Sequence, residues 1–198
     1  MSLPRKILFR YVAVACVLIL VAGGAAGVSG CAGAAARQAG GAPVHVISNV
    51  PFYPQKKDQC GPASLAGVLG FRGVAVSPDE IAAEIYSPTA GGSLDSDLLR
   101  YAVKKGLRAE RYRGGPEDLK AQIGRGNPLI VLVDYGFLSY RAHHFMVITG
   151  YDDHGVIANS GTDRSKYIPM GDFLKSWEKT GLWTLLIVPE GGETGGRK

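Results

Sequence analysis

The chain has 198 residues, a formal net charge of +5 at neutral pH and a hydrophobic content of 46%. Three of its basic residues lie within the first ten positions, so the remainder is only slightly basic. No dense run of lysine and arginine follows, which argues against a nucleic-acid-binding protein. The stretch from His45 to Pro189 is long enough for one compact domain and too short for two.

The N-terminal region has the pattern of a bacterial lipoprotein signal. Basic residues precede an apolar stretch, and Val28-Ser29-Gly30-Cys31 then matches a lipobox, whose cysteine receives diacylglycerol before cleavage. We therefore expect residues 1–30 to be a signal peptide and Cys31 to be the lipidation site. The alternative is an uncleaved membrane anchor, because 11–28 approaches the length of a spanning helix.

Either interpretation attaches the chain to a bacterial membrane, facing the periplasm or the cell exterior. Ala32, and not Asp, follows the lipobox cysteine, so we expect the outer membrane if the cell has two. Residues 31–44 are rich in alanine and glycine and are predicted to be a flexible tether. The domain is expected at 45–190, followed by a disordered tail at 191–198.

The first half of the domain is predicted to be mainly helical. The sequence Ser77-Pro78-Asp79-Glu80 is a capping box with proline at the first helical position. Gly106 is placed to end the helix that begins at Asp95. The expected helices are 60–71, 78–86, 95–105 and 116–125, and the expected strands are 45–50 and 107–112.

The second half consists mainly of β-branched and aliphatic runs. We expect strands at 128–135, 144–151, 156–159 and 182–188, with a short helix at 172–179. The residues 152–155 read as a hairpin turn. Helices followed by a mainly antiparallel sheet indicate an α+β fold. No glycine-rich phosphate loop links a strand to a helix, which disfavours a nucleotide-binding fold.

Cys60 is the most informative residue of the domain. Cys16 lies in the predicted signal peptide and Cys31 in the lipobox, so Cys60 has no partner for a disulfide. It begins a predicted helix, and a helix N-terminus stabilises a thiolate. We therefore expect a reactive thiol whose pKa lies below that of a free cysteine. The alternative is a small residue of the core.

His144 is the candidate base for this thiol. It begins a predicted strand, and the alternation that follows suggests that it shares the sheet face that meets the first helix. His143 should point to the opposite face, since side chains alternate along a strand. The alternative is a polar histidine at a strand edge.

Asn159 is the candidate group for orienting His144. If 153–154 forms the turn, Asn159 lies on the same sheet face as His144. The simple register places it opposite Ile148, so a strong twist or a bulge must close the gap to His144. Asp163 fits that register better, but the strand is expected to end before it. Asn159 could equally begin a turn with the residues that follow.

These motifs together resemble the bacteriocin-processing, double-glycine-type cysteine peptidases, which are papain-like. The resemblance rests on Gln55 before Cys60-Gly61-Pro62-Ala63-Ser64-Leu65, on the run from His144 to Asp152, and on the Asn that ends the next strand. It implies a papain-like fold with N-terminal helices packed on the sheet. It also implies that Cys60 is the nucleophile, His144 the base and Asn159 the orienting group, where the family has Asp.

The resemblance further implies an oxyanion donor upstream of the nucleophile. Gln55 best matches it, with Gln59 as the competing residue. The expected activity is hydrolysis of peptide bonds by a Cys-His-Asn triad in a membrane-tethered lipoprotein without a transporter domain. The alternatives are a non-catalytic peptide-binding module and an acyl transferase on the same scaffold.

The expected partners follow from this function. They are a peptide or protein substrate, the lipid membrane through acylated Cys31, and an unidentified transport or envelope partner. No metal or organic cofactor and no nucleic acid are expected, since His143 and His144 are adjacent and do not have ligand spacing.

Overall fold

The computed structural model describes residues 44–191. The predicted signal peptide, Cys31, and nearly all of the tether and tail lie outside these residues. No helix within 44–191 is both long enough and apolar enough to span a bilayer.

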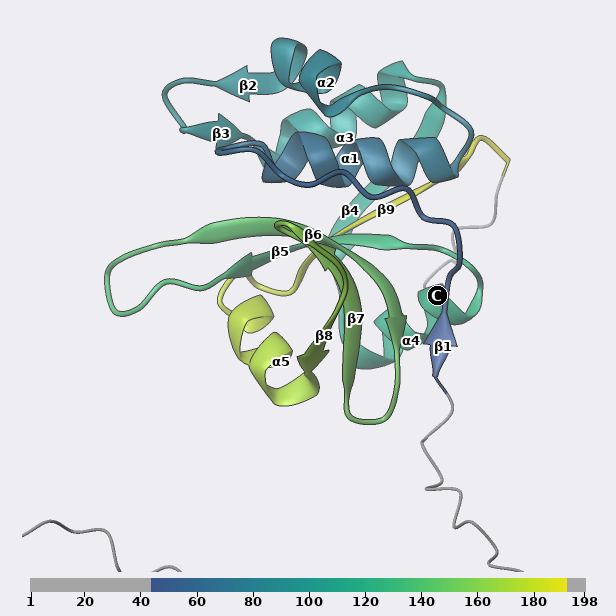
Figure 1. Cartoon of the computed structure of the whole chain (residues 1–198), viewed down its shortest axis with the longest axis vertical. Helices are drawn as coiled ribbons and strands as arrows, with labels where there is room; N and C mark the ends of the chain where they lie inside the picture. Colours follow the sequence, from purple (N-terminus) through teal and green to yellow (C-terminus); the bar gives the residue numbers. More distant parts are fainter. Residues whose placement is uncertain (1–43, 192–198) are drawn as a thin grey trace, which may run out of the picture. The chain divides into compact units, whose positions relative to one another are not determined.

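Helices cover both faces of one sheet (Figure 1). The helices α1, α2 and α3 lie on one side, and the helices α4 and α5 lie on the other. Their bounds are α1 Cys60–Phe71, α2 Pro78–Ile85, α3 Asp95–Lys104, α4 Pro116–Gly124 and α5 Met170–Glu178. All five agree with the predicted helices to within two residues at each end.

The sheet has the strand order β4-β9-β5-β6-β7-β8, and β1 pairs with β6. Its strands are β1 His45–Val46, β4 Leu107–Arg113, β5 Leu129–Asp134, β6 His143–Tyr151, β7 Gly155–Ser160, β8 Asp163–Pro169 and β9 Trp183–Pro189. A separate hairpin joins β2 Tyr86–Ser87 to β3 Gly92–Ser93. All pairings within 44–191 are antiparallel, which confirms the predicted α+β plan.

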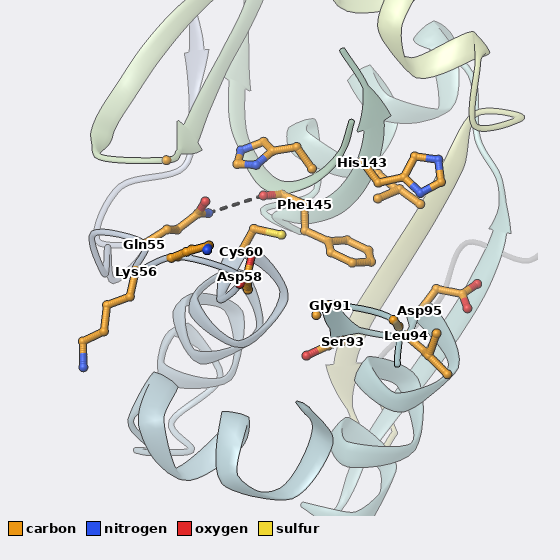
Figure 2. Close-up of a pocket in the computed structure, with 16 residues that line it drawn as sticks. Gln55, Lys56, Asp58, Cys60, Gly91, Ser93, Leu94, Asp95, His143 and Phe145 are labelled. Atoms are coloured by element: carbon orange, nitrogen blue, oxygen red, sulfur yellow. Dashed lines mark hydrogen bonds between the residues drawn. The ribbon is translucent and has the colours of Figure 1, made fainter. Parts of the chain in front are cut away.

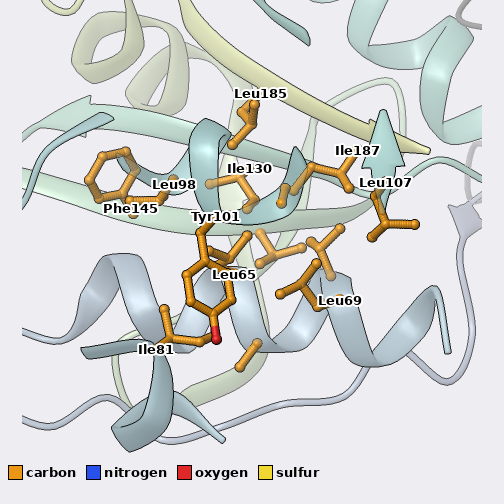
Figure 3. Close-up of a cluster of buried hydrophobic side chains, with 14 of the residues drawn as sticks. Leu65, Leu69, Ile81, Leu98, Tyr101, Leu107, Ile130, Phe145, Leu185 and Ile187 are labelled. Atoms are coloured by element: carbon orange, nitrogen blue, oxygen red, sulfur yellow. The ribbon is translucent and has the colours of Figure 1, made fainter. Parts of the chain in front are cut away.

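The central strand β6 divides the core into two clusters. Phe145 and Val147 pack with the helices α1 to α3 on one face (Figure 3). Met146 and Ile148 pack on the other face with Phe173 of α5. Because helices cover both faces of the sheet, the residues of β6 that point to either face are apolar. The strand is therefore hydrophobic along nearly its whole length.

Local signals in the sequence produce the helix starts. The predicted capping box at α2 is present: the Ser77 hydroxyl accepts from the Glu80 N–H at 3.2 Å, and the Glu80 carboxylate accepts from the Ser77 N–H at 2.8 Å. The helix α1 has no side-chain cap. Its first backbone N–H groups therefore remain available at the end where Cys60 lies.

Strand β8 was not predicted from the sequence. The expectation that the strand carrying Asn159 ends before Asp163 is confirmed, since β7 ends at Ser160, but the chain turns at once and Asp163 begins β8 opposite Ser160. The side chains of β8 are mostly exposed, so the strand has almost no hydrophobic periodicity to reveal it.

Candidate active site

Cys60 is half-buried at the N-terminus of α1 and forms no disulfide. Burial raises the pKa of the Cys60 thiol above its ordinary value. Hydrogen bonds to backbone groups of Phe145, Gly61 and Cys60 itself act in the opposite direction, and the nearby Asp58 charge adds to the increase. The prediction of a lowered pKa is therefore wrong, because desolvation outweighs the helix N-terminus.

His144 is half-buried near the start of β6. Its Nε2 atom lies 3.0 Å from the Oγ atom of Ser160, at the end of β7. Burial lowers the pKa of the imidazole, and the positive charge of Lys166 lowers it further. The hydrogen bond to Ser160 occupies Nε2, so Nδ1 is the ring nitrogen left to exchange a proton with another group.

The structure distinguishes the two adjacent histidines. His143 is exposed and pairs with Asp134 across the β5–β6 ladder. In Figure 2 its ring lies toward Asp95, away from Gln55 and Cys60. His144 is the histidine that is both partly desolvated and held by a side chain on a neighbouring strand.

The predicted facing of His144 is wrong. Phe145 and Val147 pack toward α1, so alternation places His144 on the same face as Met146. The ring nevertheless reaches a pocket that Cys60 also lines, because this pocket lies at the start of β6 and beyond the packed face. Since both faces of β6 are apolar, the hydrophobic pattern could not distinguish them.

The predicted position of Asn159 is also wrong. The β6–β7 register shifts between Ile148 and Gly150, so Asn159 lies opposite Val147 and not Ile148. Its side chain accepts a hydrogen bond from the Ser165 N–H at 3.1 Å and lines a separate depression with that residue. The irregularity reverses the face on which each later β7 residue lies relative to the simple register.

Ser160 takes the position next to His144 that was predicted for Asn159. It is 6% exposed and lies behind the imidazole. Tyr135, which follows β5, lies beside His144: their ring centroids are 5.9 Å apart. No local residue pattern marks the register shift, so the sequence held no signal that pointed to Ser160.

The two candidate glutamines point to different places. The Gln55 amide donates to the Phe145 carbonyl at 3.3 Å beside Cys60 (Figure 2). The Gln55 backbone N–H donates to the Gly161 carbonyl at 2.9 Å, which fixes this segment against the β7–β8 turn. The Gln59 amide instead donates to Asp79 of α2 at 3.4 Å.

One pocket of about 650 Å³ brings three of the predicted residues together: Gln55, Cys60 and His144. Residues of the β2–β3 hairpin and the start of α3 form its opposite wall. Within 44–191 no group of three or more histidine, cysteine or acidic residues is arranged to hold a metal ion. The pocket therefore offers a thiol, the imidazole of His144 and amide donors, and His143 lines it as well.

The fold is that of papain-like cysteine peptidases. Residues 47–183 match the Peptidase_C39 like family, and the chain belongs to that family. A search among curated proteins gave no match.

Solved structures agree with this assignment. A C39-like peptidase from Bacillus anthracis is 21% identical with a TM-score of 0.63, covering 75% of this chain and 98% of its own. A double-glycine motif protease from an AMS/PCAT transporter, solved with its leader peptide, is 28% identical with a TM-score of 0.57, covering 77% and 96%. The peptidase domain of Streptococcus ComA, a bifunctional ABC transporter of a quorum-sensing pathway, is 21% identical with a TM-score of 0.60, covering 72% and 100%.

Proposed function

We propose that this protein is a cysteine peptidase that hydrolyses peptide bonds with Cys60 as the nucleophile and His144 as the base. The observation that carries the proposal is that Cys60, His144 and Gln55 line one pocket. The hydrogen bond between His144 Nε2 and Ser160 leaves Nδ1 for the thiol proton. The solved complex of a related protease with its leader peptide supports a peptide as the substrate.

The first half of the reaction forms an acyl-enzyme. Because burial keeps Cys60 as a thiol and His144 as a neutral imidazole, the thiol proton passes to Nδ1 as sulfur attacks the scissile carbonyl. The Cys60 N–H and the Gln55 amide stabilise the resulting oxyanion. The C–N bond then breaks, and the imidazolium gives its proton to the leaving amine.

The second half of the reaction releases the acyl group. Neutral His144 takes a proton from water, which attacks the thioester carbonyl and forms a second oxyanion. When this intermediate collapses, the carboxylic acid leaves, and the thiolate recovers its proton from His144. An amine that enters in place of water would give acyl transfer by the same steps.

Products of the purified protein incubated with a peptide library test the proposal. Mass spectrometry should detect cleaved peptides that are absent from a Cys60→Ala control. Identical product spectra for the two proteins would contradict peptidase activity and leave the second candidate, a non-catalytic peptide-binding module. That candidate is favoured by a specific observation: a hydroxyl, not a carboxylate, contacts His144 Nε2.

We also propose that the protein is a lipoprotein, anchored by acylated Cys31 and facing away from the cytoplasm. The Val28-Ser29-Gly30-Cys31 box supports this proposal. Cells fed a fatty-acid analogue should label the protein, and a Cys31→Ser variant should lose the label. Equal labelling of the two proteins would contradict acylation at Cys31.

A further inference from the structure

The loop between β5 and β6 exposes a dense group of apolar side chains. Phe137 is 78% exposed, Leu138 88% and Tyr140 72%, and Tyr135 is 54% exposed at the base of the loop. In Figure 1 the connection from β5 to β6 extends beyond the helices that cover the sheet. The other large apolar side chains that are exposed within 44–191 lie singly or in pairs on other elements. Isolated apolar side chains are ordinary on a protein surface, whereas a contiguous group marks an interaction site.

Hydrogen bonds hold this loop in one conformation. The buried Asp134 carboxylate accepts from the N–H groups of Gly136 and Ala142 at 2.8 and 2.9 Å. At the tip, the Tyr140 N–H donates to the Phe137 carbonyl at 3.1 Å. The apolar side chains therefore cannot turn back into the core unless these bonds break.

The exposed charged side chains bonded to the loop are basic. Lys179, after α5, donates to the Gly136 carbonyl at 2.7 Å. The exposed Arg141 lies 2.9 Å from the carboxylate of Asp134, which is itself buried. Residues 135–143 contain no acidic side chain. Aromatic rings flanked by lysine and arginine, whose long stems are apolar and whose heads are cationic, suit the interface of an anionic bilayer.

The proposed lipid anchor can bring this loop to a membrane. His45 pairs with Tyr151 at the far end of β6, and the loop precedes His143 at the near end. The nine residues of β6 separate these ends by about 27 Å. The chain from Cys31 to Val44 can span up to about 45 Å, so it is long enough for the loop to face the bilayer. An anchor also raises the effective concentration of the loop at the lipid surface, so a weak contact suffices.

A second copy of the chain fits the loop less well than a lipid surface does. A stable protein interface buries about 800 Å² on each partner. The loop offers instead a narrow apolar tip next to charged side chains. Insertion of such a tip among lipid headgroups needs no broad complementary face.

We propose that the β5–β6 loop contacts the surface of an anionic bilayer, with Phe137, Leu138 and Tyr140 among the lipid headgroups. The loop runs directly into His143 and His144, which line the candidate active-site pocket. Contact with the bilayer would therefore hold this pocket beside the lipid surface, where peptides bound to the membrane can reach it.

The test is tryptophan fluorescence of the full-length protein with its anchor, reconstituted in nanodiscs of phosphatidylcholine and phosphatidylglycerol that hold one copy each. The native Trp177 and Trp183 are buried and give a constant background. In Phe137→Trp the emission should shift to the blue and be quenched by lipids brominated near the top of the acyl chain. Val103→Trp is the matched control, because it places a reporter at an exposed apolar position of α3. Tyr140→Trp repeats the measurement from a second position of the loop.

Quenching of both loop reporters but not of the α3 reporter supports the proposal. Equal quenching at all three positions, or no quenching of either loop reporter, would overturn it. A blue shift that appears only when a peptide is added would assign the loop to the substrate and also overturn it. The same holds for a shift seen in crowded vesicles but not in nanodiscs, which would assign the loop to a second copy.

The lipid contact and the earlier proposals fail separately. The mass of the intact protein reports whether Cys31 is acylated. Quenched loop reporters in a protein without acyl groups would refute the lipid anchor and leave the loop contact standing. Acylated protein with unquenched loop reporters would refute the loop contact alone. Neither result depends on whether Cys60 cleaves a peptide.

Discussion

The two halves of the candidate active site are held by different means. On the helix side, Cys60 is fixed by the start of α1, whose residues 61–69 are all buried. On the sheet side, His144 is fixed by one hydroxyl on β7, next to a ladder with a register shift. The position of the nucleophile therefore depends on core packing, whereas the orientation of the base depends on a single hydrogen bond to Ser160. Substitutions on the first side should mainly change stability, and substitutions on the second should mainly change rates.

The largest expected effect is loss of the base. His144→Ala should lower turnover about a thousandfold or more, since nucleophile and base act as a unit. The neighbouring His143→Ala is the matched control and should keep most activity, because its ring lies toward Asp95 (Figure 2). Steady-state kinetics on a cleaved peptide measures both. If His143→Ala were the inactive variant, the assignment of the base would be wrong.

Substitutions in the core that holds α1 should lower the stability of the protein. Leu65 of α1 is fully buried, so Leu65→Ala should lower the free energy of unfolding by about 2–5 kcal/mol. Val103 of α3 is 51% exposed, and Val103→Ala should change it by no more than about 0.5 kcal/mol. Urea denaturation compares the two variants. A small change for Leu65→Ala would mean that the core does not hold the Cys60 end of α1.

Substitutions on the sheet side sharpen the comparison. Ser160→Ala should lower kcat about ten- to hundredfold, because losing one orienting hydrogen bond costs about 1–3 kcal/mol. Asn159→Ala should leave kcat near that of the parent and lower stability by about 1 kcal/mol, since it removes the acceptor for the Ser165 N–H. Kinetics and denaturation together separate these outcomes. The reverse pattern would restore Asn159 as the orienting residue.

A smaller effect concerns the thiol itself. Because burial raises the Cys60 pKa, the thiolate fraction at neutral pH lies below that of an ordinary thiol. Iodoacetamide should therefore alkylate Cys60 several-fold more slowly at pH 7 than it alkylates a free cysteine. The alkylation rate should keep rising with pH beyond the ordinary pKa of a cysteine thiol. A rate that levels off below pH 7 would show a stabilised thiolate. It would contradict a resting state in which Cys60 and His144 are both uncharged.

The same contrast explains which features the sequence could predict. The start of α1 at Cys60 and the capping box at Ser77 depend on residues within one helical turn, and both were predicted correctly. The register of β7 depends on an irregularity near Thr149, which no local residue pattern indicates, so Ser160 lies beside His144 where Asn159 was expected. The facing of His144 could not be predicted because α4 and α5 cover the second face of the sheet.

The most direct measurement of the central claim is the mass of the protein trapped by rapid acid quench during turnover of a peptide. We predict a species heavier by the mass of the N-terminal peptide fragment, attached to Cys60 as a thioester and absent from Cys60→Ala. In Ser160→Ala this species should form more slowly. Peptide cleavage with no covalent species at Cys60 in any variant, or with the adduct on another residue, would contradict the account.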